Sequence, residues 1–587
     1  MEMDVQQEPR TDGQTVPASL PPAPLRVGTA KAPGDRPHEF TFVTPDTEQQ
    51  VKNGEFVYYE AADQQVLARV IDRKALRLYP DVFLGDPGIG PAEIARVLGY
   101  EGESCELFEV TASVLGYWDD RRGLVNPRIA PRIGSPIFLV PSDTLTRVLN
   151  KKQRGERGAV EIGWMLSRRE GEVPVVLAAK EFTSTHLAII AGTGAGKSYT
   201  AGVLIEELLK PTTMGCILVL DPHGEYKTLS GIENRSEFAA DGYRARIEIL
   251  PPEQVKIRHS ALRLSDLRSL LTNLSDGMYS VLQDAYDMVH KEASLTRGHP
   301  DRWTFQDLLA AIEQIREKSE QDRTPLASSA SALFRRVRDL DRSSKIFTET
   351  EHQRLESVLK PGQCTVVPLD EADLREQRVV ASVLLRRIFD GRQGTVRGTL
   401  EPGDDLHLPY PVFVLLEEAH TFAPSGTDGE QVVSAQIMKQ ILSEGRKFGL
   451  GIGLISQRPG KLDSDVLSQC MTQIVMRIVN PIDQETVART VESASREALD
   501  ELPALSRGQA IVLGSSLNAP VMVSVRQRIS THGGQDIDAP GEWTRYFSPE
   551  SVAARRRAQA APPPGQRPGV GFRGRSMKDI GYDPDED

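Results

Sequence analysis

The chain has 587 residues, of which 39% are hydrophobic and 26% are charged, values close to the average of soluble globular proteins. This length predicts two to four domains, and the composition excludes a wholly disordered chain and a fibrous repeat. The formal net charge is −12. The overall field therefore repels nucleic acid, and any DNA binding must come from a local basic surface such as the inside of a ring.

The apolar runs and the cysteines limit the cellular compartments in which the protein is expected. The longest apolar runs, such as Val412–Leu416, fall well short of the ~20 residues that a membrane span requires. The segment Met1–Arg10 is polar and has no apolar signal region. Four cysteines without CxxC spacing exclude a disulfide framework and a cysteine zinc site. We therefore expect a cytoplasmic protein without a membrane partner.

The N-terminal part predicts a leader followed by a small all-β domain. Residues 1 to about 35 are rich in Pro, Gln, Thr and Ala, which favours a disordered leader. From Phe40 onward, short alternating strands are separated by Gly, Pro and Asp turns, which predicts an antiparallel barrel or sandwich. The expected strands are Glu39–Val43, Gly54–Tyr59, Val66–Ile71, Leu107–Trp118 and Pro136–Val140.

Past Val140, strand and helix patterns alternate, which predicts an α/β core with a mostly parallel sheet. A strand at His186–Ile190 precedes a helix at Ser198–Lys210. The segment from about Ser260 to Leu359 has helical spacing and is expected to be a helical insertion. Further strands are expected at Cys216–Leu220, Cys364–Pro368, Val412–Leu416, Gly451–Ser456, Gln473–Ile478, Ala510–Leu513 and Val521–Val525. After Pro540 an Arg- and Pro-rich tail is expected to be disordered or to form an arm that clasps a neighbouring subunit.

A glycine-rich turn joins the first core strand to its helix, the context that a P-loop requires. Its residues are Ala191, Gly192, Thr193, Gly194, Ala195, Gly196, Lys197 and Ser198. Backbone N–H groups of such a turn surround a β-phosphate, Lys197 would bridge the β- and γ-phosphates, and Ser198 would bind Mg²⁺. Ala191 stands where the strict pattern has glycine. The alternative, a turn that binds nothing, is disfavoured by Gly-Lys-Ser in this context.

A second strand ends in two acids. Val412–Leu416 is followed by Glu417, Glu418, Ala419 and His420. Apolar strands that end this way hold Mg²⁺ and polarise the attacking water in P-loop enzymes. Glu417 would be the outer-sphere Mg²⁺ acid and Glu418 the general base. A buried strand ending in solvated carboxylates is the alternative, and a P-loop upstream disfavours it.

A polar amide and an arginine complete the candidate site. Gln457 follows the strand Gly451–Ser456 and suits a γ-phosphate sensor. Arg446 lies in a loop from which it could reach the nucleotide of a neighbouring subunit. Its spacing fits a solvated helix end equally well.

Together these motifs resemble those of the HerA group of hexameric DNA-translocating ATPases, relatives of the FtsK motors. The resemblance covers about residues 25 to 535. Its marks, besides the P-loop, are Asp221-Pro222-His223-Gly224-Glu225-Tyr226, Glu417-Glu418-Ala419-His420, Gly445-Arg446-Lys447-Phe448-Gly449, Ser456-Gln457-Arg458-Pro459, Arg477-Ile478-Val479-Asn480-Pro481-Ile482-Asp483-Gln484 and Leu505-Ser506-Arg507-Gly508.

The resemblance implies an α/β fold with a RecA-like P-loop ATPase core. It places a leader at residues 1–24, a β-barrel for assembly or partner docking at 25–150, the core at 151–535 with its helical insertion at about 258–360, and a tail at 536–587. ATP and Mg²⁺ are the implied cofactors. By resemblance, ATP binds residues Gly192 to Tyr199, Ser198 and Glu417 hold the metal, and Glu418, Gln457 and Arg446 act in catalysis, Arg446 across a subunit interface.

The implied function is an ATP-driven homohexameric translocase or helicase on double-stranded DNA, independent of sequence. It would process DNA ends in double-strand-break repair with a nuclease partner similar to NurA. The alternative is a ring that serves as the assembly platform of an antiviral defence nuclease or other effector. The stretch Gly391–Arg397, with Arg392 and Arg397, is expected to be a loop, either a pore contact or, as we slightly favour, a solvated surface turn.

Overall fold

The computed structural model describes residues 24–45, 49–76, 107–119, 121–296, 302–349, 353–426, 432–490, 499–531 and 538–553. The chain divides into two units, Met1–Gly533 and Gly534–Asp587. Residues 1–23 of the expected leader, most of the expected tail and the expected barrel loops between residues 77 and 106 lie outside the described residues.

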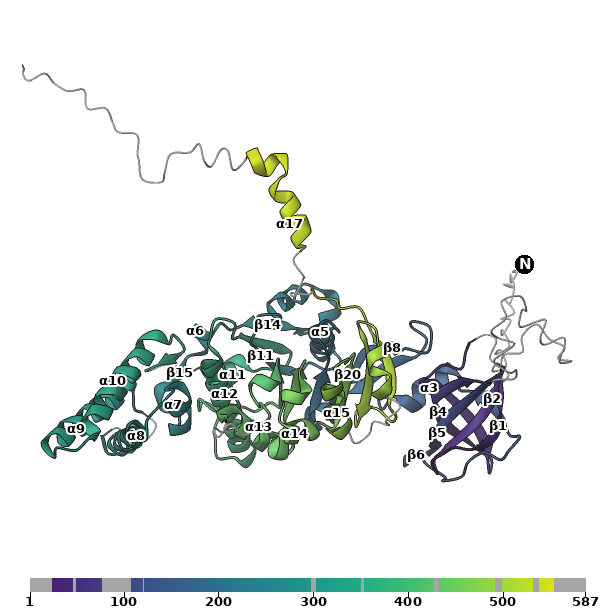
Figure 1. Ribbon diagram of the computed structural model, residues 1–587, viewed down its shortest axis with the longest axis horizontal. Coiled ribbons are helices and arrows are strands. Elements are labelled where there is room, and N and C mark those ends of the chain that lie inside the picture. The colour runs from purple at the N-terminus through teal and green to yellow at the C-terminus, as the bar shows by residue number, and fades with distance from the viewer. Residues whose placement is uncertain are drawn as a thin grey trace, which may run out of the picture. The chain divides into compact units, whose positions relative to one another are not determined.

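The N-terminal part of the first unit is a closed antiparallel barrel of six strands (Figure 1). The strand order is β2-β1-β7-β3-β4-β5, and the pairing of β2 with β5 closes the barrel. Alternate residues point inward, so Phe40, Phe42, Val57 and Tyr59 form its core. The strands are β1 (Arg26–Pro33), β2 (Glu39–Thr44), β3 (Phe56–Ala61), β4 (Gln64–Ala75), β5 (Phe108–Asp119) and β7 (Pro136–Leu139), and β6 (Gly123–Val125) extends β5.

Strand β1 corrects the expected leader, which on composition reached to about residue 35. Arg26–Pro33 has few large apolar side chains, because its inward position is filled by the small side chain of Ala30. A register shift between Ala30 and Ala32 breaks the alternation further. The other expected barrel strands are present, with ends that differ by only a few residues.

The larger part of the first unit is built on an 11-stranded sheet in the order β14-β17-β11-β18-β19-β10-β20-β21-β22-β8-β9. The seven strands from β14 to β20 are parallel, and the remaining pairings are antiparallel. The strands are β8 (Ala159–Met165), β9 (Pro174–Ala178), β10 (Leu187–Ile190), β11 (Cys216–Asp221), β14 (Arg246–Ile249), β17 (Gln363–Pro368), β18 (Val412–Leu416), β19 (Leu450–Ser456), β20 (Thr472–Met476), β21 (Gln509–Gly514) and β22 (Val521–Val525).

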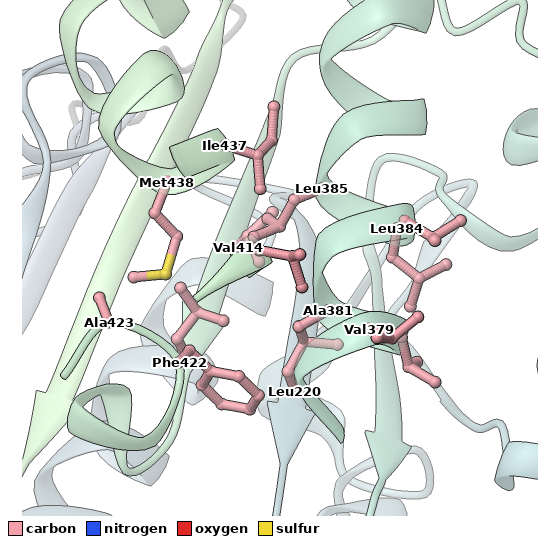
Figure 2. Close-up of a cluster of buried hydrophobic side chains, with 14 of the residues drawn as sticks. Leu220, Val379, Ala381, Leu384, Leu385, Val414, Phe422, Ala423, Ile437 and Met438 are labelled. Atoms are coloured by element: carbon pink, nitrogen blue, oxygen red, sulfur yellow. The ribbon is translucent and has the colours of Figure 1, made fainter. Parts of the chain in front are cut away.

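Helices cover both faces of the parallel strands, which explains why these strands are apolar throughout rather than alternating. On one face, Phe413 and Leu415 of β18 share a core with α5 (Lys197–Leu209). On the other face, Val414 packs with residues of α12 (Leu374–Arg397) and α13 (Val433–Glu444), as Figure 2 shows. Because the seven strands are parallel, their carboxyl ends meet at one edge of the sheet, where the candidate residues follow β10, β11, β18 and β19.

Between β14 and β17 the chain is mainly helical. The α-helices are α6 (Pro252–Val255), α7 (Leu264–Leu270), α8 (Asp276–Thr296), α9 (Phe305–Gln321), α10 (Leu326–Ser343) and α11 (Leu355–Val358). Thr304 caps α9 by accepting from the N–H of Asp307, whose carboxylate accepts from the N–H of Thr304 in return. The short strands β15 (Ile257–Arg258) and β16 (Phe347–Thr348) of this region pair with each other in parallel.

The stretch Gly391–Arg397 is helical, so the expectation of a loop was wrong. It forms the last turns of α12, and Arg392 is buried and donates to the carbonyls of Phe448 (2.8 Å) and Leu408 (2.7 Å). The glycines that suggested a loop permit close packing instead, since a Cβ at Gly391 would lie 2.4 Å from the carbonyl oxygen of Leu406.

The described part of the second unit contains α17 (Ala539–Tyr546), in a tail that was expected to be disordered or an arm. Asp538 caps it by accepting from the N–H of Gly541, and Trp543, Tyr546 and Phe547 are exposed. Among the described residues, no helix combines the length and apolarity that a membrane crossing needs.

Candidate functional site

The turn between β10 and α5 has the conformation of an anion-binding loop. Gly194 and Gly196 have φ angles of +76° and +106°, which favour glycine. The first N–H groups of a helix have no partner within it, and no side chain caps the start of α5 after Gly196. Ala191 is buried and donates its N–H to the carbonyl of Ser456, which shows that alanine is accommodated there. This end of α5 suits phosphate.

Lys197 lies between the two acids that follow β18. Its ammonium group contacts Glu417 Oε1 and is 3.1 Å from Glu418 Oε1. The Lys197 side chain is 12% exposed, and those of Glu417 and Glu418 are 0% and 2% exposed. Burial alone would lower the pKa of Lys197, but the two carboxylates raise it above its usual value. The structure therefore brings the predicted lysine and both predicted acids together.

Glu417 and Glu418 are adjacent, but their pKa values shift in opposite directions. Burial raises the pKa of Glu417 to about 7, although Lys197 and the hydroxyl of Tyr226, which donates to Glu417 Oε2 at 2.8 Å, oppose this rise. Burial also acts on Glu418, but there the interactions with His420 and Lys197 outweigh it and lower the pKa. At neutral pH, Glu418 is the stronger candidate for an ionised proton acceptor.

Two residues next to these acids were noted in the sequence only as family marks, without a role. Tyr226 is fully buried, and the turn that carries it is fixed by Asp221, which accepts from the N–H groups of His223 and Tyr226. His420 Nδ1 lies 3.2 Å from Glu418 Oε2 and 3.3 Å from Ser456 Oγ. In the sequence, the position of Tyr226 and His420 soon after buried strands was the only indication of a role. Their contacts could not be predicted, because these depend on how three strands pack together.

The other predicted residues are placed differently. Gln457 follows β19 and accepts from Thr193 Oγ1 at 3.5 Å, so it lies beside the phosphate-binding turn. Tyr199 accepts from the N–H of Arg528 at 2.6 Å and faces the segment after β22. Arg446 is exposed in the 3₁₀ turn Gly445–Phe448, which precedes β19, whereas Gln457 follows it. The structure does not bring Arg446 to the phosphate-binding turn of its own chain.

The arrangement fits Mg²⁺ bound with a phosphate. Lys197 Nζ contacts both Glu417 Oε1 and Ser198 Oγ (3.4 Å), the two oxygens predicted to bind the metal. No group of three or more His, Cys, Asp or Glu side chains among the described residues could enclose a metal. Mg²⁺ commonly takes one or two protein oxygens and completes its shell with phosphate and water, so Ser198 and Glu417 suffice.

Comparisons with known proteins agree with this geometry. Residues 160–388 match the family described as "Helicase HerA, central domain". The DNA double-strand break repair helicase HerA of Pyrococcus furiosus is 30% identical over 484 residues, which cover 76% of this chain and 83% of that protein. The chain belongs to the HerA helicase family. The HerA protein of Saccharolobus solfataricus of the same description is 27% identical over 82% of this chain and 90% of its own length.

HerA membership confirms the expected enzyme class, an ATP-driven DNA helicase or translocase. A weaker likeness is to the solved structure of VirB4 of Thermoanaerobacter pseudethanolicus, with a TM-score of 0.45 and 16% identity, covering 64% of this chain and 97% of that one.

Proposed function

We propose that this chain binds Mg·ATP at the turn after β10 and uses its hydrolysis to move along double-stranded DNA. The observation that carries the proposal is the placement of Lys197 between Glu417 and Glu418 in a nearly dry site. When a nucleotide binds, its phosphates replace the carboxylates as partners of Lys197, which leaves Glu417 and Glu418 free to act.

Each residue then has a separate task. The N–H groups from Gly192 to Tyr199 bind the phosphates, and Lys197 neutralises their charge. Ser198 and Glu417 hold Mg²⁺, and Glu418 accepts the proton of the attacking water. Gln457 senses the γ-phosphate from the end of β19, next to Thr193. Arg446 stabilises transition-state charge in the site of a neighbouring subunit. Two observations support this role: Arg446 is exposed, and it lies before β19, whereas the chain's own site lies at the other end of that strand.

The role in the cell that we propose is DNA end processing in double-strand-break repair. Two relatives are described as DNA double-strand break repair helicases. The motor acts as a homohexamer with a nuclease partner similar to NurA. Six copies of the barrel form a collar that receives the nuclease, which is supported by its separate fold and by the absence of the nucleotide-binding motifs from its sequence.

The test is Glu418→Gln. Because an amide cannot accept the proton of water, this variant should still bind ATP but turn it over at least about 100-fold more slowly. Glu401→Gln is the control, since it removes an exposed charge from the segment between α12 and β18, and it should remain within a few-fold of the unmodified protein. Near-normal turnover by Glu418→Gln would show that Glu418 is not the base and would direct attention to Glu417.

A further inference from the structure

A cavity of about 730 Å³ lies beside the phosphate-binding turn, and three cations line it. They are Arg458, Lys461 and Arg477, all exposed, and none of them forms an ion pair with another described residue. The carboxylate of Asp483 also lines the cavity, but its Oδ1 accepts from the N–H of Gly460 at 3.0 Å. This is a local excess of positive charge on a chain with a net charge of −12.

The cavity adjoins the phosphate cradle and shares part of its wall with the nucleotide site. Gly192, Thr193 and Gln457, which contact the nucleotide in the proposed function, line it, but among the described residues that line it there is none from the start of α5, residues 196–199. In the proposed function, Lys197 neutralises the charge of the nucleotide phosphates. The three cations are therefore available for a second polyanion that lies close to the γ-phosphate end of the site.

The backbone that carries these cations is held in place before any ligand binds. Ser425 donates its hydroxyl to the carbonyl of Gly460 (3.1 Å) and its N–H to the carbonyl of Lys461 (2.7 Å). The carbonyl of Arg477 accepts from the N–H of Gly192 at 2.8 Å. Fixed backbone reduces the conformational entropy that ligand binding must overcome, as preorganised sites require.

A chain of polar contacts connects this cavity with the proposed base. The N–H of Arg458 donates to Ser456 Oγ at 3.1 Å, and Ser456 Oγ lies 3.3 Å from His420 Nδ1. The same nitrogen of His420 is 3.2 Å from Glu418 Oε2. A displacement of the Arg458 backbone therefore changes the surroundings of Glu418 through only two intervening side chains.

We propose that Arg458, Lys461 and Arg477 bind the backbone phosphates of double-stranded DNA, and that this contact adjusts Glu418 through Ser456 and His420. Arginine and lysine contact phosphates without reading sequence, which suits a motor that must move along any duplex. The inference rests on the proposed function, because it names the residues that hold the substrate of that motor. It also replaces Arg392, whose burial excludes it as a DNA contact.

The test compares DNA affinity at several salt concentrations for the unmodified protein and for Arg458→Gln, Lys461→Gln, Arg477→Gln and the triple variant. A labelled duplex of mixed sequence is titrated by fluorescence anisotropy between about 50 and 200 mM salt. The slope of log Kobs against log salt should become shallower by about 0.9 for every phosphate contact that a variant removes from the ring, so the triple variant should lose about three times as much slope as a single variant. Arg489→Gln is the control, because Arg489 is also exposed but already pairs with Glu485 at 2.5 Å, and its slope should not change.

The outcomes separate this inference from the proposed function. If the unmodified protein binds no DNA, the proposed function fails. If it binds DNA and the triple variant has the same affinity and slope, the cation site is wrong while the function stands. If the triple variant instead loses binding of a fluorescent ATP analogue with DNA binding unchanged, the cavity belongs to the nucleotide and the inference is overturned.

The connection to Glu418 has its own measurement. Ser456→Ala removes the hydroxyl between Arg458 and His420, so it should keep the salt slope of DNA binding but reduce the ratio of ATP turnover with DNA to turnover without DNA by several-fold. An unchanged ratio would show that the DNA contact does not act through Ser456.

Discussion

At the scale of single residues, two neighbouring glutamates have different properties because their surroundings differ. The sequence predicts both acids at the end of one strand. It does not show which of the two is buried more deeply, so their separate roles follow from the resemblance to other P-loop enzymes. Burial raises the pKa of Glu417 to about 7, whereas His420 and Lys197 lower that of Glu418. The hydrogen bond from the Tyr226 hydroxyl to Glu417 was not predictable, because Tyr226 lies in a loop 191 residues away in the sequence.

Removal of the Tyr226 hydroxyl tests the difference between these acids. In Tyr226→Phe the charged form of Glu417 loses a hydrogen bond, so the pKa of Glu417 should rise further above about 7 and a larger fraction should be protonated at neutral pH. A protonated carboxyl binds Mg²⁺ poorly. The Mg²⁺ concentration that half-saturates ATP turnover should therefore increase about tenfold at neutral pH, as expected from a hydrogen bond to a charged group worth about 1.5–3 kcal/mol.

The same titration at about pH 9 is the control, since Glu417 then ionises in both proteins and the difference should shrink. A Mg²⁺ requirement that rises equally at both pH values would contradict this account and would indicate that Tyr226 only supports the fold.

At the scale of elements, strands were predicted well where hydrophobic residues run continuously, and poorly where packing depends on small residues. The strands Val412–Leu416 and Val521–Val525 were placed without error. The strand β1 and the last turns of α12 were misjudged because small residues fill tightly packed positions there. Ala30 is buried in the barrel, and the site of Gly391 has no room for a Cβ, properties of the packed structure that composition does not reveal. The antiparallel side of the sheet arises where short connections, such as that between β21 and β22, leave no room for a crossover.

His186 supplies a pH-dependent link between three of these elements. His186 lies just before β10. Its Nδ1 accepts from the N–H of Ile452 in β19 (3.1 Å), so its Nε2 carries the proton and donates to the carbonyl of Leu442 in α13 (2.9 Å). Burial lowers the pKa of His186 to about 4, so the folded state keeps it neutral. The unfolded chain binds the proton first, so stability is lost as the pH falls from about 6.5 to about 4.

The expected loss over this range is on the order of 3 kcal/mol. In His186→Gln, whose amide donates but does not titrate, the free energy of unfolding should be lower near neutral pH and should fall less between about pH 6.5 and 4. Denaturant unfolding across this range gives the comparison, with His223→Gln as an exposed control. Parallel curves for the unmodified protein and His186→Gln would contradict the assignment.

At the scale of the whole molecule, a single chain does not hold every predicted catalytic group in one place. Lys197, Glu417, Glu418 and Gln457 meet at the carboxyl edge of the sheet, whereas Arg446 precedes β19. The sequence predicted the four groups that meet within one chain because each of them follows a recognisable strand. The place of Arg446 in an assembly cannot follow from one chain, since it depends on how copies pack together.

A mixing experiment tests the proposed role of Arg446. Arg446→Ala should fold, bind nucleotide and assemble, but hydrolyse ATP slowly, because the transition-state charge loses its partner from the adjacent subunit. Rings that combine Arg446→Ala with Glu418→Gln contain some interfaces with an intact Glu418 and an intact Arg446, so part of the turnover should return. No recovery in rings shown to be mixed would place the action of Arg446 within its own subunit or in the structure alone.

The most direct test of the central claim, that hydrolysis at Lys197 and Glu418 drives movement along duplex DNA, is displacement of a triplex-forming third strand from linear duplex DNA. The unmodified protein should release the third strand only when ATP and Mg²⁺ are present. Glu418→Gln should bind the same nucleotide and the same DNA without releasing the strand. Release by Glu418→Gln, or sustained ATP turnover by the unmodified protein that never releases the strand, would contradict the claim.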